Sequence, residues 1–195
     1  IKAGKNPATK FNIATAGPAS AGLTATEILR KYLGFQYNHL TYDSGKAASV
    51  ACAAGEAEMV PQLAVEQVDL WKAGKLLPLA VIGQNPLTVK GYNKAIPPIT
   101  NWLPEVTAGA NYFGIWLYKG TPDNVVKTLG KLWDEVIGKS QLIKDYCEAN
   151  GAQFEPVWGD KAVKRVYGHI QAVSWVYYEG GRAKVSPETV GIPKP

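Results

Sequence analysis

The stretch FNIATAGPASAGLTATEIL, residues 11–29, decides how the first half of the chain folds. The apolar run from Phe11 to Thr15 predicts a β-strand, and an amphipathic helix is predicted from Ser20 to Leu33. Small residues form the short turn between them. Such a turn leaves the unpaired N–H groups of the helix start at the carboxyl end of the strand. The stretch therefore predicts a site for an anion.

The residues of this turn suit close contact with a ligand. Gly17 and Gly22 let the backbone approach a bound group. Either Ser20 or Thr24 can start the helix, and Thr24 with Glu27 has the spacing of a capping box, so the start is open. An ordinary strand-to-helix turn explains the same residues equally well. The candidate ligand residues here are Thr15, Ala16, Gly17, Pro18, Ala19, Ser20 and Gly22.

A second loop, TYDSGKAAS at residues 41–49, repeats the order of strand end, polar turn and helix start. Ser44 and Gly45 are further ligand candidates, since open α/β sheets bind ligands at the carboxyl edge. Gln62, at the end of a third predicted strand, is expected at the same edge, although a surface amide is equally plausible. Tyr42 is expected to pack rather than to line the site. The loop is not a phosphate-binding P-loop, because Leu40 stands where that motif requires glycine.

The remaining periodicity of the first half alternates strands with helices, which predicts an α/β fold with a mostly parallel sheet covered on both faces. The further strands are expected at Asn38–Tyr42, Glu58–Leu63 and Leu76–Gly83, and the further helices at Gly45–Ala54 and Val65–Ala73.

The second half begins after a proline-rich connector from Gln84 to Ala110. An aromatic-rich strand is expected at Asn111–Lys119, followed by an amphipathic helix with Thr121 as N-cap and Pro122 as first helical residue. The other predicted elements are a helix at 141–150 ended by Gly151, a strand at 152–157, a helix at Asp160–Glu179 stopped by Gly180 and Gly181, and a tail from Arg182 to Pro195.

Composition limits the class of protein. The chain has 195 residues, 46% of them apolar and 19% charged, which is typical of soluble globular proteins. The longest apolar segment, LLPLAVIG, has eight residues and contains Pro78, so no membrane span is predicted. The net charge of +5 is scattered, so a nucleic-acid partner is not expected. Because Ile1 follows no basic and apolar leader, any export signal is expected to be absent or removed.

Residues typical of catalytic and metal sites are sparse. His39 and His169 lie in no spacing typical of metal ligands and near no nucleophile turn. Cys52 and Cys147 are expected as buried free thiols in helices. We therefore expect no metal, no cofactor and no enzymatic activity.

Several separate segments, in the right order, resemble the substrate-binding receptors of tripartite tricarboxylate transporters, also called Bug receptors. Thr15, Gly17 and Ser20 resemble the family's Ser-x-Gly-x-Gly-Ser loop. GKLLPLAVIG, residues 74–83, resembles its GK-x-x-x-LAV segment, PPITNWLPE resembles its P-T-x-x-E stretch, and YKGTPDNVVKTL resembles its P-x-GTP signature. Three residues depart from the family pattern: Ala19 replaces a glycine, Leu23 a frequent histidine and Tyr118 a proline.

The resemblance implies a type II periplasmic-binding-protein fold, a two-lobed Venus flytrap that clamps an organic di- or tricarboxylate in the cleft between its lobes. It implies a non-catalytic periplasmic receptor that delivers its ligand to a cognate membrane permease. The rival expectation is the effector-binding domain of a transcriptional regulator, which has the same architecture.

The resemblance also implies a division of the chain. Residues 1–110 correspond to a near-complete second lobe, residues 111–181 return to an incomplete first lobe, and residues 182–195 form a tail. Most of the N-terminal lobe is expected to be missing. The apolar helices after Thr121 are then expected to pack on that lobe, on a second copy of the chain, or back onto the second lobe.

Overall fold

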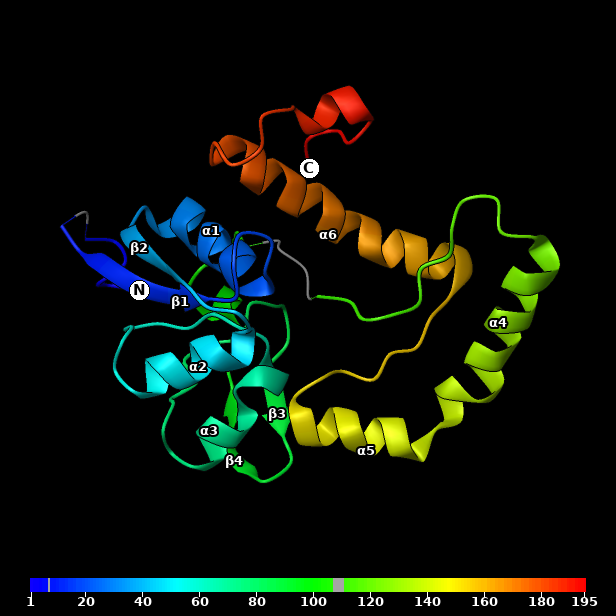
Figure 1. Cartoon of the computed structure of the whole chain (residues 1–195), viewed down its shortest axis with the longest axis horizontal. Helices are drawn as coiled ribbons and strands as arrows, with labels where there is room; N and C mark the ends of the chain where they lie inside the picture. The colour runs from blue at the N-terminus through cyan, green and yellow to red at the C-terminus, as the bar shows by residue number, and fades with distance from the viewer. Residues whose placement is uncertain (7, 107–110) are drawn as a thin grey trace.

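The computed structural model describes residues 1–6, 8–106 and 111–195. In chain order the elements are β1 (Lys10–Thr15), α1 (Ala21–Leu33), β2 (Gln36–Thr41), α2 (Gly45–Ala53), η1 (Ala64–Glu66), α3 (Val68–Lys72), β3 (Leu87–Val89), β4 (Tyr92–Ile96), η2 (Ile99–Asn101), α4 (Asp123–Glu135), η3 (Ile137–Lys139), α5 (Gln141–Asn150), α6 (Gly159–Glu179) and η4 (Pro187–Val190), where η marks a 3₁₀ helix. Figure 1 shows a body made by the elements up to β4, with α4 standing away from it and one end of α5 meeting it at β3.

The first half confirms the predicted strand–helix–strand order. β1 and β2 pair in parallel, with Ile13 opposite His39 and Thr15 opposite Thr41, and α1 connects them. Ile13 is fully buried, and it also forms a single parallel bridge to Met59. The carboxyl ends of β1 and β2 and the starts of α1 and α2 therefore lie at one edge of the sheet.

The other two strands predicted for the body are wrong. Residues 58–63 and 76–83 contribute only single bridges, Ile13 to Met59 and Val81 to Pro98. Each segment contains a proline, Pro61 or Pro78, which has no N–H to donate to a ladder. Within the described residues the sheets are a parallel β1–β2 pair and an antiparallel β3–β4 hairpin. The hairpin was not predicted, and it lies inside the proposed connector, whose residues 107–110 are outside the described ranges.

The body has three apolar clusters. One joins α1 to α6 through Ile28, Ile99, Leu103, Val106 and Val176. A second packs α3 on the hairpin through Val68, Trp71, Leu87, Val89 and Ile96. The third lies between β1 and α2 and consists of Ala14, Ala48 and Ala57. Tyr42 packs against the third cluster, as predicted, and its hydroxyl donates to Glu56 Oε2 at 2.8 Å.

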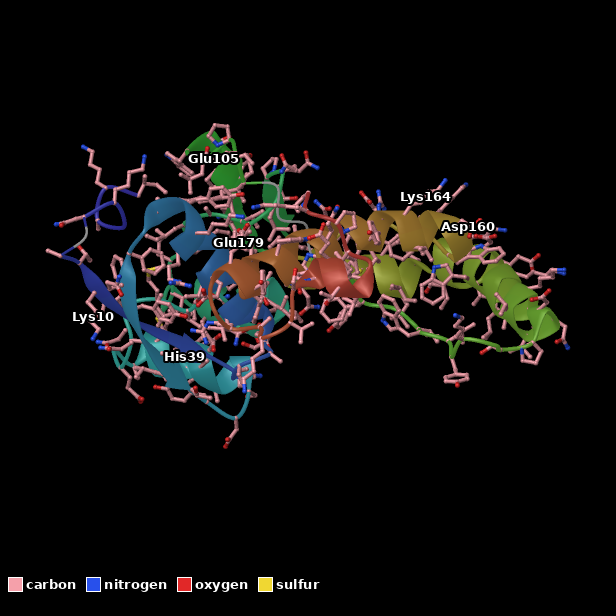
Figure 2. All side chains as sticks on the ribbon, turned by 90° about the horizontal axis from the view of Figure 1, so that it is seen from above. Lys10, His39, Glu105, Asp160, Lys164 and Glu179 are labelled. Atoms are coloured by element: carbon pink, nitrogen blue, oxygen red, sulfur yellow. The ribbon has the colours of Figure 1, made fainter. Side chains whose placement is uncertain are left out.

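Residues 111–181, which we call the arm, leave the body and return to it (Figure 1). The segment 111–120 is extended and exposed at every residue, and neither it nor residues 152–157 form a strand. Both strand predictions are therefore wrong, because neither segment has a partner strand among the described residues. Figure 2 shows the arm projecting sideways, with Asp160 and Lys164 far from His39 in the body.

The helices of the arm follow the sequence closely. α4 begins one residue later than predicted, with Pro122 as N-cap, because the Thr121 hydroxyl donates to the Tyr118 carbonyl at 2.7 Å instead of capping the helix. α5 ends at Gly151 in the left-handed conformation, as predicted. α6 is followed by Gly180, and its last turns pack on α1.

Candidate anion-binding site

The turn after β1 has the geometry expected of a strand-to-helix loop. Gly17 is buried and has a backbone φ of +119°, a value that L side chains rarely adopt. Ser20 closes the turn, because its N–H and its hydroxyl both donate to the Gly17 carbonyl, at 3.2 and 2.8 Å. Pro18 and Ala19, between them, are exposed, and Ala16 is half-buried.

Ser20 is the residue that starts α1. Its backbone is extended, and its Oγ accepts the N–H of Leu23 at 3.2 Å. Thr24 lies inside the helix, where its hydroxyl donates to the Ser20 carbonyl at 3.2 Å and contacts the Tyr177 hydroxyl at 2.9 Å. The Thr24–Glu27 capping box is therefore wrong. The N–H groups of Ala21 and Gly22 have no acceptor among the described residues.

Gln62 reaches the same helix start. Gly22 is buried, and a Cβ placed there would lie 2.7 Å from Gln62 Cδ and 3.0 Å from Nε2, so the amide group packs directly on the glycine. Gln62 Nε2 is buried and has no hydrogen-bond acceptor among the described residues. A buried donor without an acceptor costs about 1–3 kcal/mol, which an added acceptor recovers. Gln62 therefore lies against the first turn of α1, and its role in binding a ligand stays a prediction.

Thr15 supports the loop from beneath. It is fully buried, its Oγ1 accepts the Gly17 N–H at 3.3 Å, and it lies 2.6 Å from His39 Nε2 on β2. Burial, together with the positive charge of Arg182, lowers the pKa of His39 below its ordinary value of 6.5. The imidazole is therefore neutral at pH 7. No sequence motif singled out this contact, although the parallel pairing of two strand ends places residues 15 and 39 close together.

The second loop is capped as the first is. Ser44 Oγ accepts the Ala47 N–H at 3.1 Å, which makes Ser44 the N-cap of α2. Gly45 is buried, and the carboxylate of Glu66 packs against it so closely that a side chain at position 45 would collide with both oxygens. Glu66 Oε2 accepts the Leu63 N–H at 3.2 Å. Glu66 was not among the residues predicted from the sequence, although it stands three residues after Leu63, at the spacing of a capping box.

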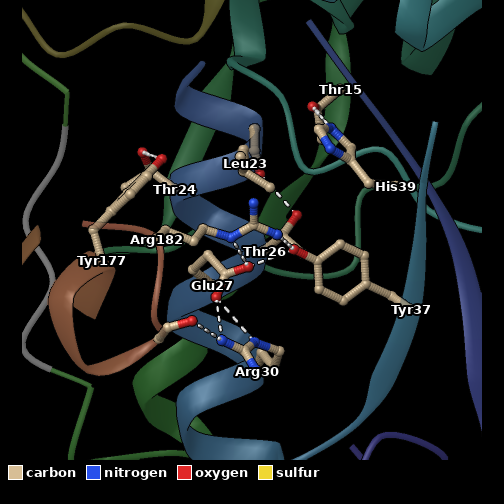
Figure 3. A network of polar contacts seen from close by, with 12 residues as sticks. Thr15, Leu23, Thr24, Thr26, Glu27, Arg30, Tyr37, His39, Tyr177 and Arg182 are labelled. Atoms are coloured by element: carbon tan, nitrogen blue, oxygen red, sulfur yellow. Dashed lines mark hydrogen bonds and ion pairs between the residues drawn. The ribbon is translucent and has the colours of Figure 1, made fainter. Parts of the chain in front are cut away.

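A buried carboxylate on α1, that of Glu27, joins α1 to the segment that follows the arm (Figure 3). The Glu27 side chain has no exposed surface and accepts hydrogen bonds from three residues. Arg30 donates through Nε at 2.9 Å and Nη2 at 2.7 Å, Arg182 donates through Nε at 2.7 Å, and the Tyr37 hydroxyl also donates. Arg182 Nη2 reaches the Tyr37 hydroxyl at 2.5 Å. We call these four residues the Glu27 cluster.

The cluster shifts the protonation of its members. Burial acts to raise the pKa of Glu27, but the hydrogen bonds from Tyr37 and the two arginines outweigh it and hold the pKa below the ordinary 4.5. Burial and the hydrogen bond to Glu27 raise the pKa of Tyr37 to about 12. Glu27 is thus a structural anion, and its partners join α1, β2 and the segment after α6.

Other features of the described residues give little chemistry. Two cavities, of about 340 Å³ beside Lys90 and Glu148 and about 170 Å³ beside Arg30 and Glu179, lie away from the loop. No three His, Cys, Asp or Glu side chains of the described ranges gather where they can hold a metal ion. Cys52 and Cys147 are half-buried free thiols. Among the helices that the structure describes, none has the length and apolarity to cross a membrane.

Comparison with known proteins gives a fold but no sequence family. No protein-family model matches the chain, and no curated protein matches it. A solved structure of a TctC solute-binding protein from Polaromonas, with no ligand, matches with a TM-score of 0.62 at 18% sequence identity. The match covers 89% of this chain and 58% of that protein. The chain therefore has a periplasmic-binding-protein-like α/β fold, similar to somewhat more than half of a TctC solute-binding protein.

Proposed function

We propose that this protein is an extracytoplasmic solute-binding receptor, which captures a small organic carboxylate for a tripartite tricarboxylate transporter. The fold similarity to a TctC solute-binding protein supports a binding role rather than a catalytic one. The observation that carries the proposal is the buried Gln62 Nε2, which packs on Gly22 in the first turn of α1 and has no acceptor among the described residues. The N–H groups of Ala21 and Gly22 likewise have no acceptor in that part of the chain. No observation favours the rival role as the effector domain of a regulator.

The binding group is the loop 16–20 with the start of α1. A ligand carboxylate there accepts hydrogen bonds from the N–H groups of Ala21 and Gly22 and from Gln62, while Thr15 and Gly17 hold the loop in place. Hydrogen bonds to a charged group contribute about 1.5–3 kcal/mol each. Three of them give roughly 5–9 kcal/mol before the cost of association of about 4 kcal/mol or more, so this group alone should bind a carboxylate only weakly, in the millimolar range. Ser44 and Gly45 are proposed to line the same edge.

The division of the chain into lobes is part of the same proposal. Residues 1–110 form the ligand-binding second lobe, the arm belongs to a first lobe, and residues 182–195 form a tail. The arm carries the exposed side chains that a first lobe buries: Phe113 is 76% exposed and Trp116 is 71% exposed. α4, α5 and α6 add exposed stripes at helical spacing, namely Val125, Leu132 and Val136, Leu142 and Tyr146, and Val163, Tyr167 and Ile170.

The proposed partners are a membrane permease, which accepts the ligand, and a polypeptide that covers the arm. We prefer the first-lobe polypeptide over a second copy of this chain as the partner of the arm, because every residue of segment 111–118 is exposed. A second copy that paired with this segment would cover only one edge of it. A compact monomer that binds no apolar dye in light-scattering and fluorescence measurements contradicts both forms of the cover.

The binding site is tested by NMR titration, which detects millimolar affinity. We expect succinate, citrate or propanoate to shift the amide signals of residues 16–22 and the side-chain amide of Gln62. Gln62→Met, which keeps the size but removes the donor, should weaken binding by about tenfold or more. Gln153→Met, at an exposed position, is the matched control and should bind as the parent does. If no carboxylate moves these signals, the proposed function is wrong.

A further inference from the structure

A continuous chain of hydrogen bonds links His39 on β2 to the start of α1. His39 Nε2 lies 2.6 Å from Thr15 Oγ1, a contact drawn in Figure 3, and Thr15 Oγ1 accepts the Gly17 N–H at 3.3 Å. The Gly17 carbonyl accepts both the N–H and the hydroxyl of Ser20, and Ser20 Oγ accepts the Leu23 N–H. The shape of the turn before α1 therefore depends on a side chain that lies outside the turn.

The direction of the hydrogen bond between Thr15 and His39 follows from the burial of Thr15. Thr15 is fully buried, so its hydroxyl proton cannot be donated to bulk water. Among the described residues, His39 Nε2 is the one hydrogen-bond acceptor of that hydroxyl. The Thr15 hydroxyl therefore donates to an unprotonated Nε2, and a lone pair of its oxygen accepts the Gly17 N–H.

A proton on His39 reverses this hydrogen bond. A protonated Nε2 only donates, so the Thr15 hydroxyl loses its acceptor and stays buried. A buried donor without an acceptor is costly. Rotation of the Thr15 side chain relieves that cost, but it also moves Oγ1 away from the Gly17 N–H. The protonation of His39 is therefore linked to the shape of the turn.

The groups around His39 keep its imidazole neutral at pH 7. The charged groups that face it are Arg182, in the segment after α6, and Glu27 on α1, and the ring of Tyr37 on the same strand has its centroid 6.5 Å away. Burial and the positive charge of Arg182 lower the pKa of His39, and the Glu27 carboxylate opposes them. The accepting form of Nε2 is thus the form present at neutral pH.

From this chain of contacts we infer that His39 is a positioning residue of the anion site: it accepts the Thr15 hydroxyl and so holds the turn 16–20 in the shape described. That shape leaves the N–H groups of Ala21 and Gly22 without an acceptor among the described residues. The inference rests on the proposed function and adds a residue that acts through Thr15 rather than by contact with the ligand. It predicts that the turn responds to the protonation of His39, although no residue from 16 to 20 has a titratable side chain.

The linkage is tested without ligand, by NMR of the full 195-residue protein between pH 8 and pH 5. We expect the Gly17 amide signal to move with the same midpoint as the ring signals of His39. The Ile143 amide, bonded to the cap Ser140 at the start of α5, is the internal control and should not follow that midpoint. Thr15→Val keeps the shape of the side chain and removes the hydroxyl, so the movement at Gly17 should fall about threefold or more, whereas Thr15→Ser should retain it.

The role in binding is tested with propanoate at pH 7.5, where the shift of the Gln62 side-chain amide gives the affinity. Thr15→Val should bind propanoate about fivefold more weakly than the parent or worse, and Thr15→Ser should recover most of that loss. Gln153→Met, at an exposed position, is again the control.

Two results overturn the inference and leave the proposed function standing: a Gly17 amide that does not follow His39 in the parent, or a Thr15→Val variant that binds propanoate as the parent does. If propanoate moves no signal of the parent, the proposed function fails, and the positioning role of His39 in binding fails with it.

Discussion

Replacing Glu27 by glutamine should destabilise the fold more than any exposed substitution, because Glu27 is an anion with no exposed surface between two arginines. The variant keeps the shape of the side chain and removes its charge, so Arg30 and Arg182 lose their counter-ion. Removing one partner of a buried ion pair costs about 3–5 kcal/mol. Because the two arginine side chains are 36% and 34% exposed, water takes over part of their solvation. We therefore expect a loss of about 3 kcal/mol.

The assay is unfolding by urea and by heat, with circular dichroism as the measured signal. For a chain of this size, 1 kcal/mol shifts Tm by about 2–4 °C, so Glu27→Gln should lower Tm by roughly 6–12 °C. Glu188→Gln, which removes an exposed charge in the tail, is the control and should shift the free energy of unfolding by less than about 0.5 kcal/mol. A double-mutant cycle with Arg182→Gln should show coupling of about 1 kcal/mol or more. A parent-like Tm for Glu27→Gln refutes the assigned role.

The pH dependence gives an independent check with a definite sign. The hydrogen bonds depress the pKa of Glu27 in the folded protein below its ordinary 4.5. The unfolded chain therefore binds a proton at this residue at higher pH than the folded chain does. The stabilisation from Glu27 is fully present above pH 4.5 and is lost as the pH falls through the folded pKa. The difference between parent and Glu27→Gln should shrink over that acid range and stay constant from pH 6 to 8.

Three further outcomes follow from the loop. Gly17→Ala should destabilise the protein by about 1–3 kcal/mol, measured by urea unfolding, because φ is +119° at this position. Ser20→Ala removes the N-cap of α1 and should cost about 1 kcal/mol in the same measurement, whereas Ser186→Ala, at a 3₁₀ turn in the tail, should cost less. NMR should show that the pKa of His39 lies below 6.5. As the pH falls below 6.5, the unfolded chain binds a proton at His39 before the folded chain does, so His39 then lowers the stability of the fold. A His39 pKa above 6.5 contradicts its burial against Thr15.

The helices were predictable because their signals are local. Ser44 precedes a helix and Gly151 follows one at the residues expected, and Ser20 is one of the two starts that the sequence left open for α1. The strands were harder, since a strand exists only where a neighbour pairs with it. Residues 111–119 have the alternation and aromatic content of a strand, yet all of them are classed as exposed and they pair with no strand in the described chain. The β3–β4 hairpin lay in a segment whose prolines had suggested a loop.

In the candidate site, too, the local features could be predicted from the sequence and the contacts between distant residues could not. The loop 15–22 could be read from sequence because strand end, turn and helix cap are contiguous. Gln62 was expected at the end of a third strand that forms only one bridge, and the structure packs it on Gly22 at the start of α1. The contacts of Glu27 with Tyr37 and Arg182, and of Thr15 with His39, were not predicted, because the partners lie 10 to 155 residues apart and depend on how β2 and the segment after α6 pack on α1. Glu66 reaches Gly45 only through the packing of its segment on α2. Glu27 was even assigned to a cap, which is what its local spacing suggests.

The remote contacts matter to the site because they fix the helix on which it is built. α1 is held at its start by the Ser20 cap and, about two turns later, by Glu27, whose partners include Tyr37 of β2 and Arg182 of the segment after α6. A loop held by rigid neighbours loses little conformational entropy when a ligand binds, and the smaller entropy loss gives a higher affinity. Among the described residues, the hydrogen bonds of the Glu27 cluster run between its members and to Gly180 and not to the loop 16–20, so the contribution to binding that we propose for it is the position of the α1 amides. Weakening of carboxylate binding in Glu27→Gln, with the Gln62 amide signal still shifted by ligand, is the result that separates this positioning role from direct contact.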